Sequence, residues 1–278
     1  MVGKHGLNFI TLLNNIITYA SETQIIKLDG HDIYNGKENQ DEIIQSLNTQ
    51  GYYKLNSRLD NTYLDKLETI FTYDFDTFQK SRIFITEQEL LQNNDILNLW
   101  TDKFFLNLAA KFLNNYPILD YLVAYKSFPP KDGIDERKED IKFHFDADRI
   151  KMLKLIIYFS DVKNELDGPY THISQSLDQM KPYNMPFDES FNYDDACKYF
   201  NMENIINLYG ERGTMYLVNP SFIHRGTRLQ RGERKILQLQ WCNSLFGYFI
   251  SKKKLNKNFV KNLIDNYPEN KYLLEKYL

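Results

Sequence analysis

Two short segments of the sequence carry histidine and carboxylate side chains at spacings that suit a metal ion. In the first, His144 and Asp146 are two residues apart, and residues i and i+2 of a β-strand point to the same face. Asp148 shares that face, but four strand residues span about 13 Å, so Asp146 is the better partner for His144. In the second segment, a short strand would present His224.

Two imidazoles and one carboxylate form a facial set of ligands that leaves coordination positions open. Such a set is typical of non-haem iron(II) oxygen chemistry. The chain has only two cysteines, Cys197 and Cys242, which excludes a disulfide scaffold and a cysteine-based zinc site. With no thiolate in the set, Fe(II) is favoured over zinc as the working metal.

Arg234 follows His224 by ten residues and begins the next predicted strand. A turn over residues 230–232 would make the two strands antiparallel, so the guanidinium could project into the same cavity. A guanidinium fork binds a carboxylate with two hydrogen bonds. By the two-residue period of a strand, the same face carries Ile236, Gln238 and Gln240, and the other face carries Lys235, Leu237, Leu239 and Trp241.

The elements that must position these side chains are strands in the middle of the chain, with helices on either side. Strands are predicted at 51–55, 118–128, 141–147, 153–162, 169–174, 213–218, 222–228 and 234–241. Helices are predicted at 7–20, 41–48, 61–71, 95–115, 194–200 and 252–278. Segregated elements of this kind favour an α+β fold with antiparallel sheets and helices packed on one side.

No linker rich in Pro, Gly or Ser divides the chain, so we expect a single domain over residues 1–278. Its expected parts are a helical region, a β core with an insert, and a helical tail. These parts are residues 1–116, 117–245 (insert 178–210) and 246–278. We expect the insert and a charged loop at 129–140 to cover the mouth of the site, where long loops commonly carry specificity.

Composition excludes several classes of protein. A net charge of −3 argues against a nucleic-acid-binding protein, which is normally basic. No stretch approaches 18 consecutive apolar residues, so no membrane span is expected. The apolar residues of 7–20 are interrupted by Asn and Thr, which favours an amphipathic helix over a signal peptide. We therefore expect a cytoplasmic location.

Four stretches of the chain resemble the phytanoyl-CoA dioxygenase family of Fe(II)/2-oxoglutarate oxygenases. Residues 44–55 are similar to the opening helix and first strand of that family, and His144-Phe-Asp146 looks like its metal motif. Residues 155–176 resemble a strand followed by an Asn-Gly-Pro segment. Residues 213–226, together with Arg234, look like its distal histidine and oxoglutarate-binding arginine.

The resemblance implies a double-stranded β-helix, which is a cupin-like jelly roll of two facing sheets. It implies that His144, Asp146 and His224 hold Fe(II), and that Arg234 binds the distal carboxylate of 2-oxoglutarate. Lys126 lies on a strand that often contacts cosubstrate in the family, and Gln238 is a second candidate. The implied reaction consumes O2, hydroxylates a substrate and releases succinate and CO2; the carboxylate of Asp146 implies hydroxylation rather than halogenation.

Two other functions stay open from the residues alone. One is a metal-dependent cupin that does not use 2-oxoglutarate, and the other is a catalytically silent jelly-roll binding module. We expect a small or carrier-bound substrate, and two interpretations of the arginines near the distal histidine stay open: a solvated turn, or a site for an anionic substrate. These arginines are Arg225, Arg228 and Arg231. His172 is a further candidate for substrate contact, and the sequence does not indicate the oligomeric state.

Overall fold

The structure, a computed structural model, describes the greater part of the chain. The described residues are 27–72, 81–129, 142–146, 149–174, 193–244, 254–274 and 277. The predicted helix at 7–20, most of the loop at 129–140, Asp148 and residues 178–192 of the insert lie outside them.

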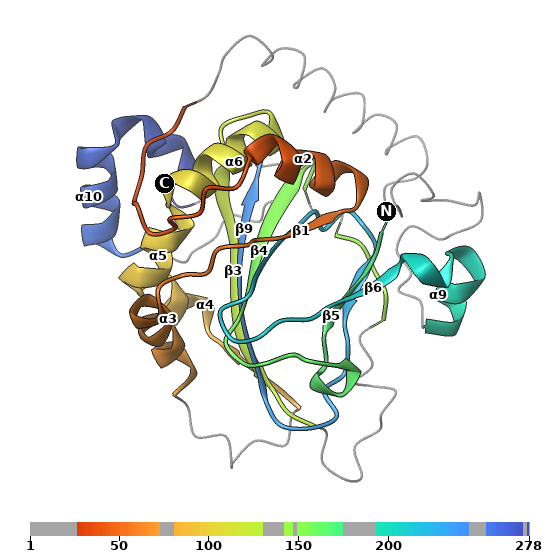
Figure 1. The fold of residues 1–278 in the computed structure, drawn as a ribbon. Coiled ribbons are helices and arrows are strands. Elements are labelled where there is room, and N and C mark those ends of the chain that lie inside the picture. Colours follow the sequence, from red (N-terminus) through yellow and green to blue (C-terminus); the bar gives the residue numbers. More distant parts are fainter. Residues whose placement is uncertain are drawn as a thin grey trace.

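Two antiparallel sheets form the β core of the described residues (Figure 1). The larger sheet has the strand order β1-β7-β4-β9-β3-β2, and the smaller has the order β6-β5-β8. The strands of the larger sheet are β1 (Tyr52–Lys54), β7 (Met215–Val218), β4 (Met152–Tyr158), β9 (Arg234–Cys242), β3 (Ile118–Ser127) and β2 (Arg82–Ile85). Those of the smaller are β6 (Ile205–Leu208), β5 (Tyr170–Ile173) and β8 (His224–Gly226).

Side chains alternate between the two faces of the larger sheet, as the two-residue period of a strand requires. On β9, Leu237, Leu239 and Trp241 pack into the main core with the helices. Ile236 lies on the opposite face, in a second core that includes Tyr170 of the smaller sheet. The sequence-based assignment of the two faces of β9 is therefore confirmed, and so is the jelly-roll fold.

Helices cover the outer face of the larger sheet, while α9 lies beside β6 (Figure 1). The α-helices are α2 (Gln40–Thr49), α3 (Asn61–Glu68), α4 (Glu87–Leu90), α5 (Asn94–Trp100), α6 (Lys103–Leu113), α9 (Tyr193–Tyr199) and α10 (Lys257–Asn266). The 3-10 helices are η1 (Thr69–Phe71), η2 (Glu165–Asp167), η3 (Met202–Asn204) and η4 (Pro268–Leu274). Within the described residues, no helix has the length and apolar character needed to cross a membrane.

The structure corrects three sequence-based assignments. The single helix expected at 95–115 is two helices, because Asp102 caps α6 through the backbone N–H groups of Phe104 and Phe105. Of the segment expected as a strand at 141–147, the described residues 142–146 form only a bridge at His144. Strands β2 and β6 were not predicted; β6 lies in the insert, after the expected helix.

Candidate metal centre

The two histidines are held opposite each other by a pair of backbone hydrogen bonds. The amide N of His144 donates to the carbonyl O of His224 at 2.9 Å, and the reverse bond measures 2.8 Å. Residues that face each other across an antiparallel pair point to the same side. The ring centroids are accordingly 4.5 Å apart. Asp146 is fixed two residues later, where its amide N donates to the carbonyl of Pro220 at 2.9 Å.

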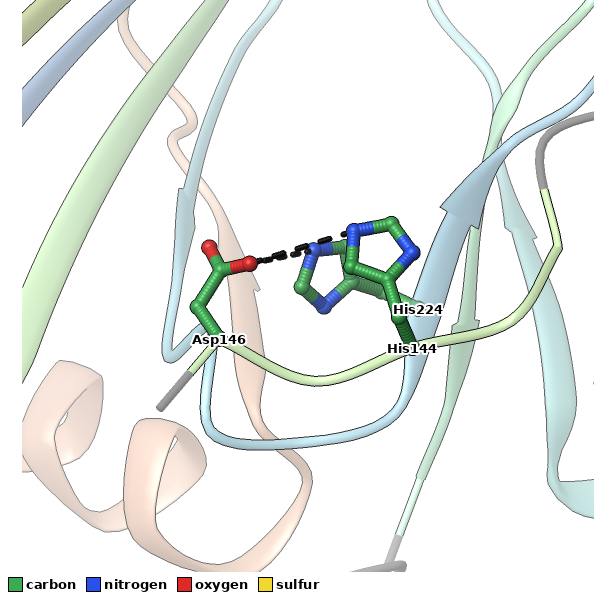
Figure 2. Close-up of side chains that lie close together, drawn as sticks. All are labelled: His144, Asp146 and His224. Atoms are coloured by element: carbon green, nitrogen blue, oxygen red, sulfur yellow. Dashed lines mark ion pairs between the residues drawn. The ribbon is translucent and has the colours of Figure 1, made fainter. Parts of the chain in front are cut away.

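Backbone contacts also set which nitrogen of each ring is available. Nδ1 of His144 lies 2.9 Å from the carbonyl O of Lys142, and Nδ1 of His224 lies 2.9 Å from that of Phe222. A carbonyl only accepts, so Nδ1 carries the proton in both rings and Nε2 keeps its lone pair. Both Nε2 atoms lie 3.8 Å from Oδ1 of Asp146 (Figure 2). One ligand atom from each residue lies within 4.8 Å of the others, the arrangement a metal ion needs.

Charges around the triad favour the metal-binding protonation states. Burial alone would raise the pKa of Asp146, but the Lys154 ammonium and the two histidines hold that pKa at about 2. Burial lowers the pKa of His224 to about 4, and the Asp146 carboxylate offsets only part of this shift. At neutral pH the carboxylate is therefore ionised and His224 is neutral, as metal ligation requires.

Solved structures resemble the chain in fold. No protein-family model matches the sequence, and no curated protein matches it. HygX from Streptomyces hygroscopicus with nickel, 2-oxoglutarate and hygromycin B bound aligns with a TM-score of 0.55 and 12% identity, covering 73% of this chain and 87% of HygX. The epimerase SnoN in complex with Fe3+, alpha ketoglutarate and nogalamycin RO aligns with a TM-score of 0.53 and 13% identity, covering 73% and 83%. The chain has the fold of these two proteins.

Arg234, at the start of β9, is buried, and two of its three guanidinium nitrogens have no hydrogen-bond partner among the described residues. The side chain is 1% exposed, and only Nη1 donates a hydrogen bond, to the carbonyl of Thr227 at 3.3 Å. Within the part of the chain that the structure describes, Nε and Nη2 have no hydrogen-bond partner, and neither does the hydroxyl of Ser127, which faces Arg234 across β3 and β9. A buried cation with unsatisfied donors is costly. These residues therefore fit a carboxylate, which would accept from all three groups.

The other two cosubstrate candidates lie on opposite faces of the sheet. Gln238 lines a cavity of about 370 Å³ together with the triad. Lys126 faces Lys235 across the strands and forms an ion pair with Glu233 at 2.8 Å. Because Lys235 lies on the helix-covered face, the structure does not bring Lys126 to the triad.

The remaining sequence candidates have structural partners. His172 is buried, and its Nε2 donates to the carbonyl of Gln50 at 3.0 Å, so this ring fixes the smaller sheet to the end of α2. Arg231 pairs with Asp167 at 2.8 Å, and Arg225 lies over the ring of Phe143. Like Arg228, these two arginines are absent from the described lining of the cavity.

Sequence reasoning missed four charged residues that line the cavity, namely Lys154, Asp120, Arg149 and Arg82. Lys154 pairs with Asp146 at 2.9 Å. Asp120 and Arg149 pair with each other at 3.1 Å. Lys154 stands alone as a charged residue in the otherwise apolar strand β4, and charged residues are almost never buried without a partner. That contrast was the available signal.

Proposed function

We propose that this protein is a non-haem Fe(II)- and 2-oxoglutarate-dependent oxygenase of the phytanoyl-CoA dioxygenase type. The observation that carries the proposal is the pairing of a metal-ligand triad with a buried, unsatisfied guanidinium. His144, Asp146 and His224 would hold Fe(II) through Nε2, Oδ1 and Nε2. Arg234 and Ser127 would hold the distal carboxylate of 2-oxoglutarate.

The chain's own residues supply binding, orientation and exclusion of water. When bound, Fe(II) with 2-oxoglutarate and O2 supplies the oxidising power for hydroxylation of a C–H bond, with release of succinate and CO2. Lys154 orients the metal-ligating carboxylate, and Tyr170 packs flat on the ring of His224, with centroids 5.2 Å apart. These contacts fix the ligand geometry before the metal arrives.

We also propose that the substrate is a small or carrier-bound molecule. The protein itself would be a single-domain enzyme of the cytoplasm. HygX binds hygromycin B and SnoN binds nogalamycin RO, which supports a small molecule. The cavity of about 370 Å³ is of a size that accepts part of such a molecule. Cys197 and Cys242 form no disulfide, and free thiols suit a reducing compartment.

The test is an anaerobic titration of the purified protein with Fe(II) and 2-oxoglutarate, followed by the visible metal-to-ligand charge-transfer band. We expect the band in the wild-type protein, its loss in Asp146→Ala and a large increase in the 2-oxoglutarate needed by Arg234→Gln. Arg231→Gln is the matched control, because this exposed arginine pairs with Asp167 and should leave the titration unchanged.

The titration also separates the two alternatives. Tight Fe(II) binding without the band would favour a cupin that does not use 2-oxoglutarate. Absence of metal binding would favour a binding module.

A further inference from the structure

A bulge in β3 brings a buried carboxylate into the cavity beside the metal triad. The register between β3 and β9 shifts so that Leu119 faces Trp241 and Tyr121 faces Gln240, which makes Asp120 the extra residue. Bulges re-aim side chains and are common next to active sites. Asp120 and Tyr121 consequently both line the cavity.

Asp120 fixes the orientation of the amide of Gln240. Nε2 of Gln240 donates to Oδ2 of Asp120 at 2.8 Å, and a carboxylate can only accept. Oε1 of Gln240 must therefore point away from Asp120. This oxygen is buried and has no hydrogen-bond partner, and Gln240 is 5% exposed. An unpaired buried acceptor of this kind costs free energy unless a ligand supplies the donor.

The charged groups nearest to Gln240 are already paired. Arg149 donates to Oδ1 of Asp120 from Nε at 3.2 Å and from Nη2 at 3.1 Å. Lys154, which faces Gln240 across β4 and β9, donates to Asp146 at 2.9 Å. An anionic group next to Oε1 would meet another acceptor. A hydroxyl or an amine would satisfy it.

We propose that Oε1 of Gln240 is the substrate-recognition acceptor of the cavity and binds a hydroxyl or amine group of the substrate. The inference rests on the proposed function for its reaction, and it assigns a hydrogen-bond donor rather than an anionic group to this position. Gln240 faces Lys154, which binds the metal-ligating carboxylate, and directly opposed residues have Cβ atoms about 5 Å apart. A substrate group bound to Gln240 would therefore lie close to Lys154 and to the Asp146 carboxylate that Lys154 binds.

The experiment measures binding of four six-membered-ring probes to the metal-free protein by saturation-transfer NMR. The probes are cyclohexane-1,4-diol, 1,4-diaminocyclohexane, 1,4-dimethoxycyclohexane and cyclohexane-1,4-dicarboxylate. We expect the diol or the diamine to bind about tenfold more tightly than the dimethoxy compound, because only the first two can donate. The tighter of the two identifies the substrate group. Because no metal or 2-oxoglutarate is present, this result is independent of the charge-transfer titration.

Two variants locate the effect. Gln240→Met removes the acceptor and should bring the diol, the diamine and the dimethoxy compound within about twofold of one another. Gln230→Met, the same change at an exposed glutamine outside the described lining of the cavity, should keep the preference. Equal binding of the donor and dimethoxy probes to wild-type protein would overturn the proposal even if Gln240→Met does not fold. Tightest binding of the dicarboxylate, or no binding of any probe, would overturn it as well.

Discussion

Nζ of Lys154 lies 2.9 Å from Oδ2 of Asp146, and this ion pair leaves Oδ1 of the same carboxylate 3.8 Å from Nε2 of both histidines. Oδ2 of Asp146 is thus bound by Lys154, and Oδ1 is the oxygen available to a metal ion. Lys154 comes from β4 in the interior of the larger sheet, so the orientation of the carboxylate depends on a strand that is buried at every residue.

Replacing Lys154 should destabilise the metal-free protein and increase the stabilisation that a metal provides. In Lys154→Met the carboxylate of Asp146 stays buried without its cation, at an expected cost of about 2 kcal/mol in the free energy of unfolding. A divalent ion then supplies the missing charge. Urea denaturation with and without Mn(II) measures both effects. Lys163→Met, which breaks an exposed pair with Asp161, should change neither. Equal Mn(II) stabilisation in wild type and Lys154→Met would contradict this role.

The buried His172 should make the metal-free protein less stable as the pH falls from 6.5 to 4. Burial lowers the pKa of His172 to about 3, so over this range the unfolded chain binds a proton that the folded chain does not. Stability is therefore lost on acidification, by on the order of 3 kcal/mol for this residue. His172→Gln keeps a donor for the Gln50 carbonyl and should show a smaller difference in unfolding free energy between the two pH values. An identical difference in both proteins would refute the assignment.

Asp102 should be irreplaceable by Asn, although both residues cap helices well. Oδ2 accepts from the amides of Ile33 and Tyr34, while Oδ1 accepts from Phe104 and Phe105. In Asp102→Asn the side-chain NH2 faces two buried donors, which should cost about 3 kcal/mol of unfolding free energy. Asp60→Asn changes an exposed cap of α3 that accepts one backbone bond, from Thr62, and should cost less than about 0.5 kcal/mol. Equal Tm values for the two variants would show that Asp102 is an ordinary cap.

Most strands of the β core were predictable from their apolar residues, but β2 and β6 were not predicted, and a bulge at Asp120 interrupts the alternation of β3. The two-residue period of 234–241 indicated that Gln238 and Gln240 share one face of the strand, and both line the cavity in the structure. The break between α5 and α6 was missed because the apolar stripe continues through it. The interruption is set by Asp102, whose long-range bonds to Ile33 and Tyr34 cannot be read from local spacing.

The clustering of His144, Asp146 and His224 was predictable from their residue types and their order in the chain, although only His224 lies on a strand and the 142–146 segment forms a bridge at His144. The surroundings of this triad were not, since they depend on strands that are distant in sequence. Gln240 was expected to face the cavity, but its orientation depends on a bulge at Asp120. Lys126 was predicted to contact cosubstrate from its position in the sequence before the metal motif. The pairing of β3 with β9 instead places Lys126 opposite Lys235, on the helix-covered face of the sheet.

The most direct test of the proposed metal centre is a crystal structure of the chain grown anaerobically with Mn(II) and 2-oxoglutarate. The account predicts a metal bonded to Nε2 of His144, Oδ1 of Asp146 and Nε2 of His224. It also predicts the distal carboxylate of 2-oxoglutarate on Nε and Nη2 of Arg234. A metal bound elsewhere, or a 2-oxoglutarate whose carboxylates leave Arg234 unpaired, would contradict it.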